Sequence, residues 1–390
     1  MDTGLLSGIT VLDLSTVGPA ARCTRLLADY GARVVKVGPV PSADAAPIEP
    51  PFFAYSGHRG MGHVLLDLKD DDGREAFLAL AAAADVVVES FRPGVVDRLG
   101  IGYEAVATRN PGIVYCSTSG YGQDGPHARW AGHDIDYLAV GGFLAMSGPG
   151  RDGAPPLPGA TIADAAAGGM HAALAITAAL AGRARTGRGA YLDVSVAEGV
   201  LWLMSLAIDE QLALGADISP GHDVLSGRYA CYGIYRASDD KWLAVGAIEA
   251  KFFANLCGSL GCPELAGAQY DDDAQPVIRA ALTAAFEART RDEWVELLSG
   301  ADTCVAPVLD VAEVASYPQF VARGTVDAAH HASEGTFTQL APLLAGMARV
   351  PEGETVELPD TAHTDTEHLL KEAGVDGETI ARWVAKRVVA

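Results

Sequence analysis

Short apolar runs alternate with helix-length segments over the first 120 residues of the chain. Strands are predicted over residues 9–14, 34–37, 86–89 and 113–117, and helices over 20–30 and 71–84. Apolar strands that alternate with helices are typical of a parallel sheet whose two faces are covered by helices. The pattern therefore predicts an α/β domain in this part of the chain.

A Gly/Pro-rich segment at 147–160 interrupts the pattern and is predicted to be a loop. Asp164 follows this loop and is predicted to be the N-cap of a helix of small residues that runs to about residue 181. Small side chains in that helix predict close packing against its neighbours. A strand over 191–196 and a helix over 197–214 are expected next.

The character of the chain changes after residue 228. A strand pair is predicted at 232–236 and 242–245, followed by helices from about 249 and over 276–299, and by a strand at 304–309. Short strands and a helical stretch at 364–387 are predicted for the last 60 residues. We therefore expect a large α/β domain (1–200), a linker (201–228), a small α+β domain (229–318) and a segment that returns to complete the large domain (319–390).

Charge and cysteine usage narrow the possible partners and location. The chain has 390 residues, 49% of them hydrophobic, and a net charge of −22, which argues against nucleic acid as a partner. The six cysteines lack zinc-site spacing, and reduced thiols in a cytoplasmic protein are expected. No basic, apolar leader opens the sequence, and the alanine-rich run 77–88 is too short to cross a bilayer. Neither a membrane association nor a metal is predicted.

Three residues carry candidate chemistry. His133 follows Gly132 and is surrounded by acids and Tyr137, a setting in which a histidine can act as a general base near neutral pH. Asp164 and Glu249 are the two other candidates, although each could simply begin a helix. No glycine-rich fingerprint follows the first predicted strand, so a dinucleotide cofactor is not expected.

The ordered set of motifs resembles the family III CoA-transferase (CaiB/BaiF) superfamily, and within it the α-methylacyl-CoA racemases. The matching segments lie at 6–14, 26–32, 66–69, 91–95, 120–126, 132–137, 186–195, 246–249 and 364–370. The resemblance implies the family III fold, with a Rossmann-like large domain and a small α+β domain. It also implies an interlocked homodimer in which His133 and Asp164 of one chain meet Glu249 of the other.

The resemblance implies an isomerase that epimerises 2-methylacyl-CoA thioesters by 1,1-proton transfer. His133 would serve one face of an enolate-like intermediate and Asp164 the other, while Glu249 would hold the histidine ring. CoA is then part of the substrate, and no separate cofactor is expected. CoA transfer between carboxylic acids through an acyl anhydride on Asp164 stays an alternative, as does a diverged relative that acts on a non-CoA acyl substrate.

The residues expected to contact the CoA thioester are Arg59, Arg92, Gly132, Asp134 and Tyr137, although Asp134 and Tyr137 could equally be packing residues. Family members commonly carry Arg-Pro near position 38 and further basic residues at 61–62, and this chain lacks both. Either Lys36, Arg59, Arg92 and His63 suffice for CoA, or the acyl group has another carrier. His222, in a second Gly-His-Asp, is predicted to be a loop residue.

Overall fold

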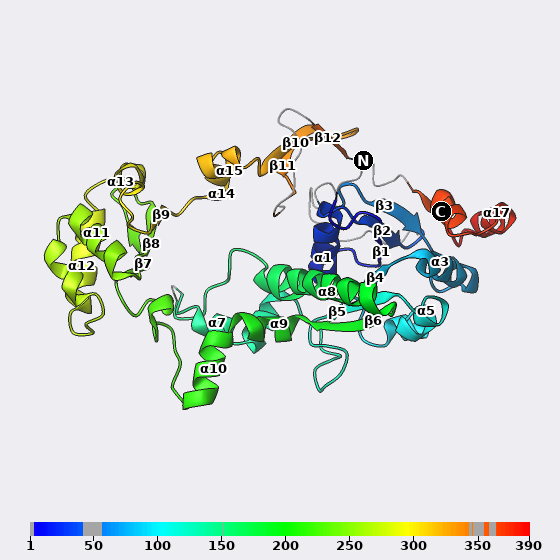
Figure 1. The fold of residues 1–390 in the computed structure, drawn as a ribbon, viewed down its shortest axis with the longest axis horizontal. Coiled ribbons are helices and arrows are strands. Elements are labelled where there is room, and N and C mark those ends of the chain that lie inside the picture. Colours follow the sequence, from blue (N-terminus) through cyan, green and yellow to red (C-terminus); the bar gives the residue numbers. More distant parts are fainter. Residues whose placement is uncertain (1–3, 42–56, 151, 343–344, 346–354, 359–363) are drawn as a thin grey trace. The chain divides into compact units, whose positions relative to one another are not determined.

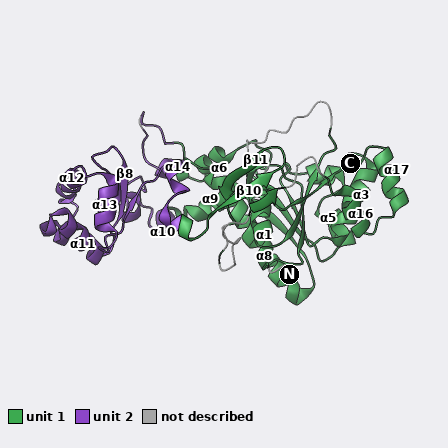
Figure 2. Cartoon of the chain, turned by 90° about the horizontal axis from the view of Figure 1, so that it is seen from above, with its two compact units in different colours: residues 1–143, 157–208, 321–390 green, residues 144–156, 209–320 purple. Residues whose placement is uncertain are grey.

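The computed structural model describes residues 4–41, 57–150, 152–342, 345, 355–358 and 364–390. The chain forms two compact units, shown in green and purple in Figure 2. Unit 1 comprises residues 1–143, 157–208 and 321–390, and unit 2 comprises residues 144–156 and 209–320. Each unit is described below by itself.

The central feature of unit 1 is a six-stranded sheet with the strand order β3-β2-β1-β4-β5-β6. Its strands are β1 (Thr10–Asp13), β2 (Arg33–Gly38), β3 (Gly62–Leu65), β4 (Val86–Glu89), β5 (Val114–Ser119) and β6 (Ala190–Ser195). Every neighbouring pair is parallel, which confirms the predicted parallel sheet. This strand order is that of the Rossmann fold, in which ligands bind beyond the carboxyl ends of the strands.

Helices cover both faces of this sheet (Figure 1). The helices of this part of unit 1 are α1 (Gly18–Asp29), α3 (Asp71–Ala83), α4 (Val95–Leu99), α5 (Tyr103–Arg109), α6 (Asp134–Val140), a π-helix η1 (Ala163–Met170), α8 (His171–Thr186) and α9 (Val196–Leu203), whereas α7 (Phe143–Met146) belongs mostly to unit 2. The side chains of neighbouring residues on a strand belong to different hydrophobic cores, one on each face of the sheet. Leu12 packs with Phe77 of α3, whereas Val11 packs with Cys23 of α1 and Ile176 of α8.

The C-terminal segment returns to unit 1. It contains a second sheet of β10 (Val326–His331), β11 (Gly335–Leu340) and β12 (Thr355–Leu358), followed by α16 (Thr366–Glu372) and α17 (Gly377–Ala385). The end of the chain pairs with the end of β3, because the Ala390 N–H donates to the Leu65 carbonyl at 3.1 Å. Leu369, Leu370 and Trp383 join the core on the α3 face of the sheet.

Unit 2 is built on an antiparallel sheet of β7 (Tyr232–Arg236), β8 (Trp242–Gly246) and β9 (Val305–Pro307). Its helices are α10 (Ser205–Leu214, mostly in this unit), η2 (Val224–Ser226), α11 (Ala250–Leu260), η3 (Pro263–Ala268), α12 (Gln275–Phe286), α13 (Arg291–Leu298), α14 (Val311–Val314) and α15 (Pro318–Ala322). His222 lies in a loop, as predicted, and its Nε2 lies 2.9 Å from the Glu210 carboxylate.

Two predicted helices are each divided into two. The helix expected over 276–299 breaks because Thr290 starts a new helix, where its N–H donates to the Glu293 carboxylate at 2.9 Å and its hydroxyl accepts from the Glu293 N–H at 3.4 Å. This reciprocal pair is a capping box. The helix expected over 197–214 similarly divides at Met204 into α9 and α10.

One helical segment among the described residues, Ala163–Thr186, is long and apolar enough to cross a membrane by length and composition alone. Core helices of soluble proteins meet the same criterion. Here the segment packs on α1, where a Cβ on Gly168 would lie only 2.5 Å from the Cβ of Pro19. The absence of a membrane association stays a prediction.

A buried ion pair ties β1 to β2. Lys36 Nζ lies 2.8 Å from the Asp13 carboxylate and donates to the Ser15 carbonyl at 2.5 Å, and both charged side chains are almost fully buried. Asp13 also accepts a hydrogen bond from the hydroxyl of Thr24 on α1. The Lys36 ammonium is thus paired with groups of the sheet itself. It contributes to the structure of the sheet rather than to an exposed phosphate site.

Substituting Lys36→Met is expected to lower the free energy of unfolding by about 3–5 kcal/mol, because it leaves the Asp13 carboxylate buried without its cation. Lys69→Met is the matched control, since Lys69 is exposed and its substitution should change stability by no more than about 0.5 kcal/mol. Urea unfolding measures both. Equal stability of the two variants would contradict the assignment of Lys36 to a structural role.

Candidate active site

His133 lies at the end of the loop that follows β5, directly before α6. Its side chain is exposed, and its backbone N–H donates to the Asp136 carboxylate at 2.9 Å. The loop leaves the sheet at the carboxyl end of β5, the edge at which α/β sheets bind ligands. The predicted general base is therefore accessible and held by the first turn of a helix.

Tyr137 fixes the shape of this loop. Its hydroxyl donates to the Gly132 carbonyl at 2.6 Å, and its ring is buried. A Cβ on Gly132 would lie 2.8 Å from that ring, and one on Gly120 would lie 2.3 Å from it. Burial is the main cause that raises the pKa of Tyr137 to about 12, so the hydroxyl stays a donor at neutral pH. Tyr137 therefore packs within the loop, and its contact with the thioester stays a prediction.

Asp164 lies inside the first turn of the π-helix η1, whose N-cap position is Ile162. The prediction that Asp164 is itself the N-cap is therefore wrong. Its backbone N–H donates to the Asp134 carboxylate at 2.8 Å, so this N–H is already occupied and does not stabilise an oxyanion. Short π-helical segments occur often at functional sites. The structure thus brings the residue next to His133 into direct contact with Asp164.

Close backbone packing sets the position of η1, as the small residues predict. A Cβ on Gly169 would lie 2.8 Å from the Cβ of Arg22 on α1, and one on Gly199 of α9 would lie 2.1 Å from the Ala167 carbonyl. Arg22 also donates to the Thr161 hydroxyl at 2.6 Å, just before η1. Helices α1 and α9 therefore hold η1 from two sides.

The environment of Asp164 favours its protonated form relative to an exposed aspartate. Burial, and after it the negative charge of Asp134, raises the pKa of Asp164, while Arg22 and His133 lower it. His133 is thus electrostatically coupled to Asp164 within unit 1. A carboxyl with a raised pKa can exchange a proton near neutral pH more readily than an ordinary aspartate.

Glu249 belongs to unit 2, where it is exposed directly before α11. The turn that carries it is fixed by Gln269, whose side-chain amide donates to the carbonyls of Ala247 at 3.0 Å and Ile248 at 2.6 Å. The Tyr270 hydroxyl also donates to the Ile248 carbonyl. A carboxylate on a rigid turn is thereby presented at the surface of unit 2.

The residues expected to contact CoA have different environments. Arg59 is buried, donates to the Leu340 carbonyl at 3.0 Å and lies 3.3 Å from the Asp29 carboxylate. This internal role differs from the expected contact with a phosphate. Arg92 is exposed and forms no ion pair with any described residue.

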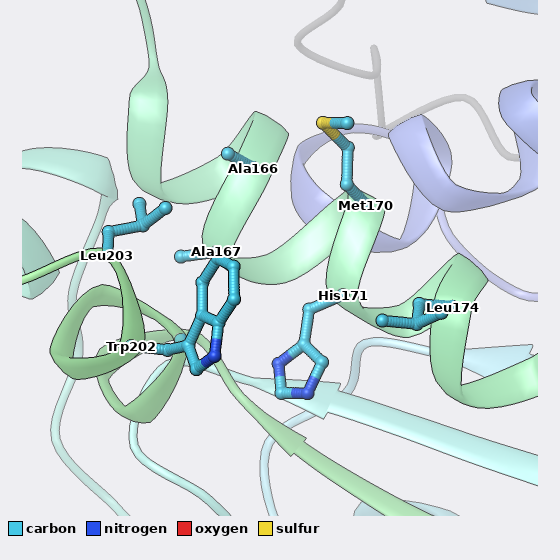
Figure 3. A pocket seen from close by; sticks show the side chains of 8 residues that line it. Ala166, Ala167, Met170, His171, Leu174, Trp202 and Leu203 are labelled. Carbon is cyan, nitrogen blue, oxygen red and sulfur yellow. The ribbon is translucent and has the colours of Figure 1, made fainter. Parts of the chain in front are cut away.

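An apolar cavity of about 470 Å³ lies beside the π-helix. Its walls include Ala166, Met170 and His171 from the Asp164 segment and Trp202 and Leu203 from α9. Figure 3 shows the rings of Trp202 and His171 pointing toward one another. Trp202 and Leu203 are the last two residues of α9, so the end of this helix supplies one wall of the cavity.

Comparisons with known proteins show which family this is. The model of CoA-transferase family III matches residues 6–359, and the chain belongs to this family. It is 34% identical to alpha-methylacyl-CoA racemase of Homo sapiens over 388 residues, which cover 98% of this chain and 97% of that protein. It is also 34% identical to acetyl-CoA:oxalate CoA-transferase of Acetobacter aceti, over 82% of this chain and 85% of that protein. A CaiB/BaiF family protein from Brucella suis superimposes with a TM-score of 0.78 at 28% identity, over 95% of this chain and 99% of that chain.

Several residues of the site were not predicted from the sequence. Asp136 and Arg22 position the His133 loop and η1, and Arg98 and Arg129 line a cavity with Arg92. Asp136 had a readable signal, because an acid three residues after a helix N-cap commonly accepts from the N-cap N–H. The positions of Arg22, Arg98 and Arg129 in the site depend on contacts between segments that are distant in the sequence.

Substituting Gly132→Ala is expected to lower the free energy of unfolding by about 1–3 kcal/mol, because the new methyl group overlaps the Tyr137 ring. The control is Gly182→Ala on α8, where no heavy atom lies within 4 Å of the new Cβ. That substitution should leave stability unchanged or raise it by up to about 1 kcal/mol. Denaturant unfolding measures both, and a neutral Gly132→Ala would contradict the tight packing of the loop.

Substituting Asp134→Asn is expected to lower the pKa of Asp164, because it removes a negative charge while leaving an oxygen to accept the Asp164 N–H. Carboxyl-carbon NMR titration measures this pKa, and the Asp164→Asn spectrum identifies the resonance. Asp136→Asn is the control, since Asp136 is not among the charges that shift Asp164. A pKa that rises or stays constant in Asp134→Asn would show that Asp134 does not act on Asp164 through its charge.

Proposed function

We propose that the protein epimerises 2-methylacyl-CoA thioesters at C2 by 1,1-proton transfer. The observation that carries this proposal is the contact between the His133 loop and Asp164, made by the hydrogen bond from the Asp164 N–H to Asp134. The proposed site combines two proton-transfer groups of different chemistry, His133 and Asp164. The similarity to alpha-methylacyl-CoA racemase along nearly the whole chain supports the same reaction.

The chemistry requires a base on one face of the substrate and an acid on the other. In one direction His133 removes the C2 proton, the thioester forms an enolate, and Asp164 returns a proton to the opposite face. In the other direction the two roles are exchanged. The raised pKa of Asp164 supports this use, since the group must be both a donor and an acceptor.

Glu249 is proposed to complete the site from a second copy of the chain. Its exposed carboxylate can accept a hydrogen bond from a histidine ring and so select the tautomer that presents the other nitrogen to the substrate. This arrangement requires the interlocked homodimer that the family resemblance implies. A cytoplasmic location is proposed with it, and six free cysteines, five of them buried, agree with a reducing compartment.

CoA transfer between carboxylic acids is the second candidate. Asp164 would attack an acyl-CoA thioester to form an acyl anhydride and expel the CoA thiolate. The thiolate would attack the Asp164 carbonyl, which releases the first carboxylic acid and leaves a CoA thioester on Asp164, and a second carboxylate would take the CoA by the same steps in reverse. The half-buried Asp164 and the 34% identity to acetyl-CoA:oxalate CoA-transferase favour this candidate. His133 is not required for it. A third reading, a diverged relative that acts on a non-CoA acyl substrate, predicts little activity on any CoA thioester.

The decisive experiment follows the C2 proton of (2R)-2-methylacyl-CoA by NMR in D2O, together with chiral analysis of the product. Deuterium incorporation with loss of stereochemical purity is expected. His133→Gln should lower the exchange rate by about two to four orders of magnitude, because it removes one of the two acid/base groups.

The same samples are assayed for CoA transfer to added carboxylic acids. His222→Gln is the matched control, because it changes the histidine of the other Gly-His-Asp and should leave exchange unaffected. Transfer without exchange, retained in His133→Gln and lost in Asp164→Asn, would replace the epimerase proposal by the transferase. No reaction of either kind would favour the non-CoA substrate.

A further inference from the structure

Arg22 of α1 is a cation of the candidate site to which the proposed reaction assigns no role. Its Cβ lies close to η1, because a Cβ on Gly169 would come within 2.8 Å of it and within 3.1 Å of the Asp164 carbonyl oxygen. At the other end of the side chain, Nη2 of Arg22 donates to the Thr161 hydroxyl at 2.6 Å. The Arg22 side chain therefore runs along η1, from Gly169 to the residue at which the helical turn of Asp164 begins.

Thr161 and Asp164 belong to one helical turn. The Ala165 N–H donates to the Thr161 carbonyl at 3.0 Å, so helical hydrogen bonding already includes Thr161. Residues three apart on a helix are neighbours on its surface, with about 5–6 Å between their Cβ atoms. The guanidinium that contacts Thr161 is thus on the side of the helix that carries Asp164. Its charge acts on the Asp164 carboxyl group, as does the charge of His133.

Arg22 has no carboxylate partner that would compete with a ligand. Within the described part of the chain it forms no ion pair, and its side-chain hydrogen bond goes to the neutral hydroxyl of Thr161. Arg25, three residues further along α1, is by contrast paired with Asp29 at 2.9 Å. A guanidinium has five N–H donors, so other donors of Arg22 remain for a ligand. Because Arg22 is half-buried, solvent screens its charge less than that of an exposed arginine.

The proposed reaction forms a negative charge at this place. When His133 removes the C2 proton, the electron pair of the C–H bond forms the C1–C2 double bond, and the π pair of the carbonyl moves to the thioester oxygen. The carboxylates of Asp134 and Asp164 oppose that charge. The Asp164 N–H does not offset it, because it donates to Asp134. Among the charged groups that act on Asp164, Arg22 is the cation that takes no part in proton transfer.

We propose that Arg22 is a further catalytic residue, whose guanidinium donates a hydrogen bond to the enolate oxygen of the substrate. This inference rests on the proposed function. A cation that is already in position stabilises an oxyanion without reorganisation at the moment of reaction. The bond to Thr161 holds one arm of the guanidinium and leaves the other to meet the oxygen. When Asp164 returns a proton to C2, the electron pairs move back, and Arg22 then contacts only a neutral carbonyl.

The test measures C2-proton exchange in D2O for Arg22→Gln, Arg22→Lys and Arg185→Gln in the full-length protein. Arg185 is exposed in the last turn of α8 and donates to the Ala181 carbonyl of its own helix, so it is the matched control. Arg22→Gln should lower kcat for exchange by about 100-fold or more and change KM less, because the oxyanion develops only in the transition state. Arg22→Lys should lose less, since it keeps the charge without the fork. Arg185→Gln should exchange as the wild type does.

Thr161→Val separates catalysis from positioning. It removes the hydroxyl that accepts from Arg22 but keeps the guanidinium, so it should lower kcat for exchange much less than Arg22→Gln does. An equal loss in Thr161→Val and Arg22→Gln would overturn the proposal, because Arg22 would then act only by holding η1. Wild-type exchange in Arg22→Gln would overturn it as well.

A binding readout is independent of turnover. Calorimetry compares the nitronate of an S-(nitroalkyl)-CoA, a planar anion with its charge on oxygen, with a neutral S-alkyl-CoA of the same chain length. The preference for the nitronate should fall on the order of tenfold in Arg22→Gln, which loses a charge-assisted contact, and stay constant in Arg185→Gln.

Two results of the calorimetry would overturn the role of Arg22: a constant preference in Arg22→Gln, or an equal loss of affinity for both compounds. A wild type that prefers the nitronate, loses this preference in Arg22→Gln and yet does not exchange the C2 proton would contradict only the proposed function.

Discussion

The hydrogen bond from the Asp164 backbone N–H to the Asp134 carboxylate is the contact on which the site depends. It joins two residues of unit 1 that are 30 positions apart in the sequence, Asp134 at the start of α6 and Asp164 in η1. Because His133 directly precedes Asp134, this one bond places the candidate base beside the candidate acid. It also brings two carboxyl groups together, and their repulsion adds to burial in raising the pKa of Asp164.

Glycines make this contact possible on both sides. Gly132 lets the His133 loop lie against the Tyr137 ring, and Gly169 and Gly199 let η1 approach α1 and α9 at backbone distance. Any larger side chain at these positions would push one segment away from the other. A small displacement would lengthen the hydrogen bond between the Asp164 N–H and the Asp134 carboxylate. It would also move the two carboxyl groups apart and so change the pKa of Asp164.

Local patterns explain which features the sequence predicts. The parallel sheet was predictable because each apolar strand reads as a continuous run, and the small residues of η1 predicted close packing. The break before α13 was missed because apolar periodicity continues through it, although Thr290 and Glu293 carry the capping-box signal. The π-helix has no such local signal, and it packs closely against α1 and α9. The convergence of Arg98 with Arg129 depends in the same way on neighbouring strands rather than on spacing.

The basic residues of unit 1 fall into two groups with different physical roles. Lys36 and Arg59 are buried beside Asp13 and Asp29, and a cation that balances an internal carboxylate cannot also be given to a ligand without leaving that carboxylate uncompensated. An anionic ligand must therefore be bound by cationic side chains that form no ion pair within the fold. Within the described part of the chain, Arg92, Arg98 and Arg129 form no ion pair, so these three side chains can meet an anionic ligand without leaving a carboxylate uncompensated.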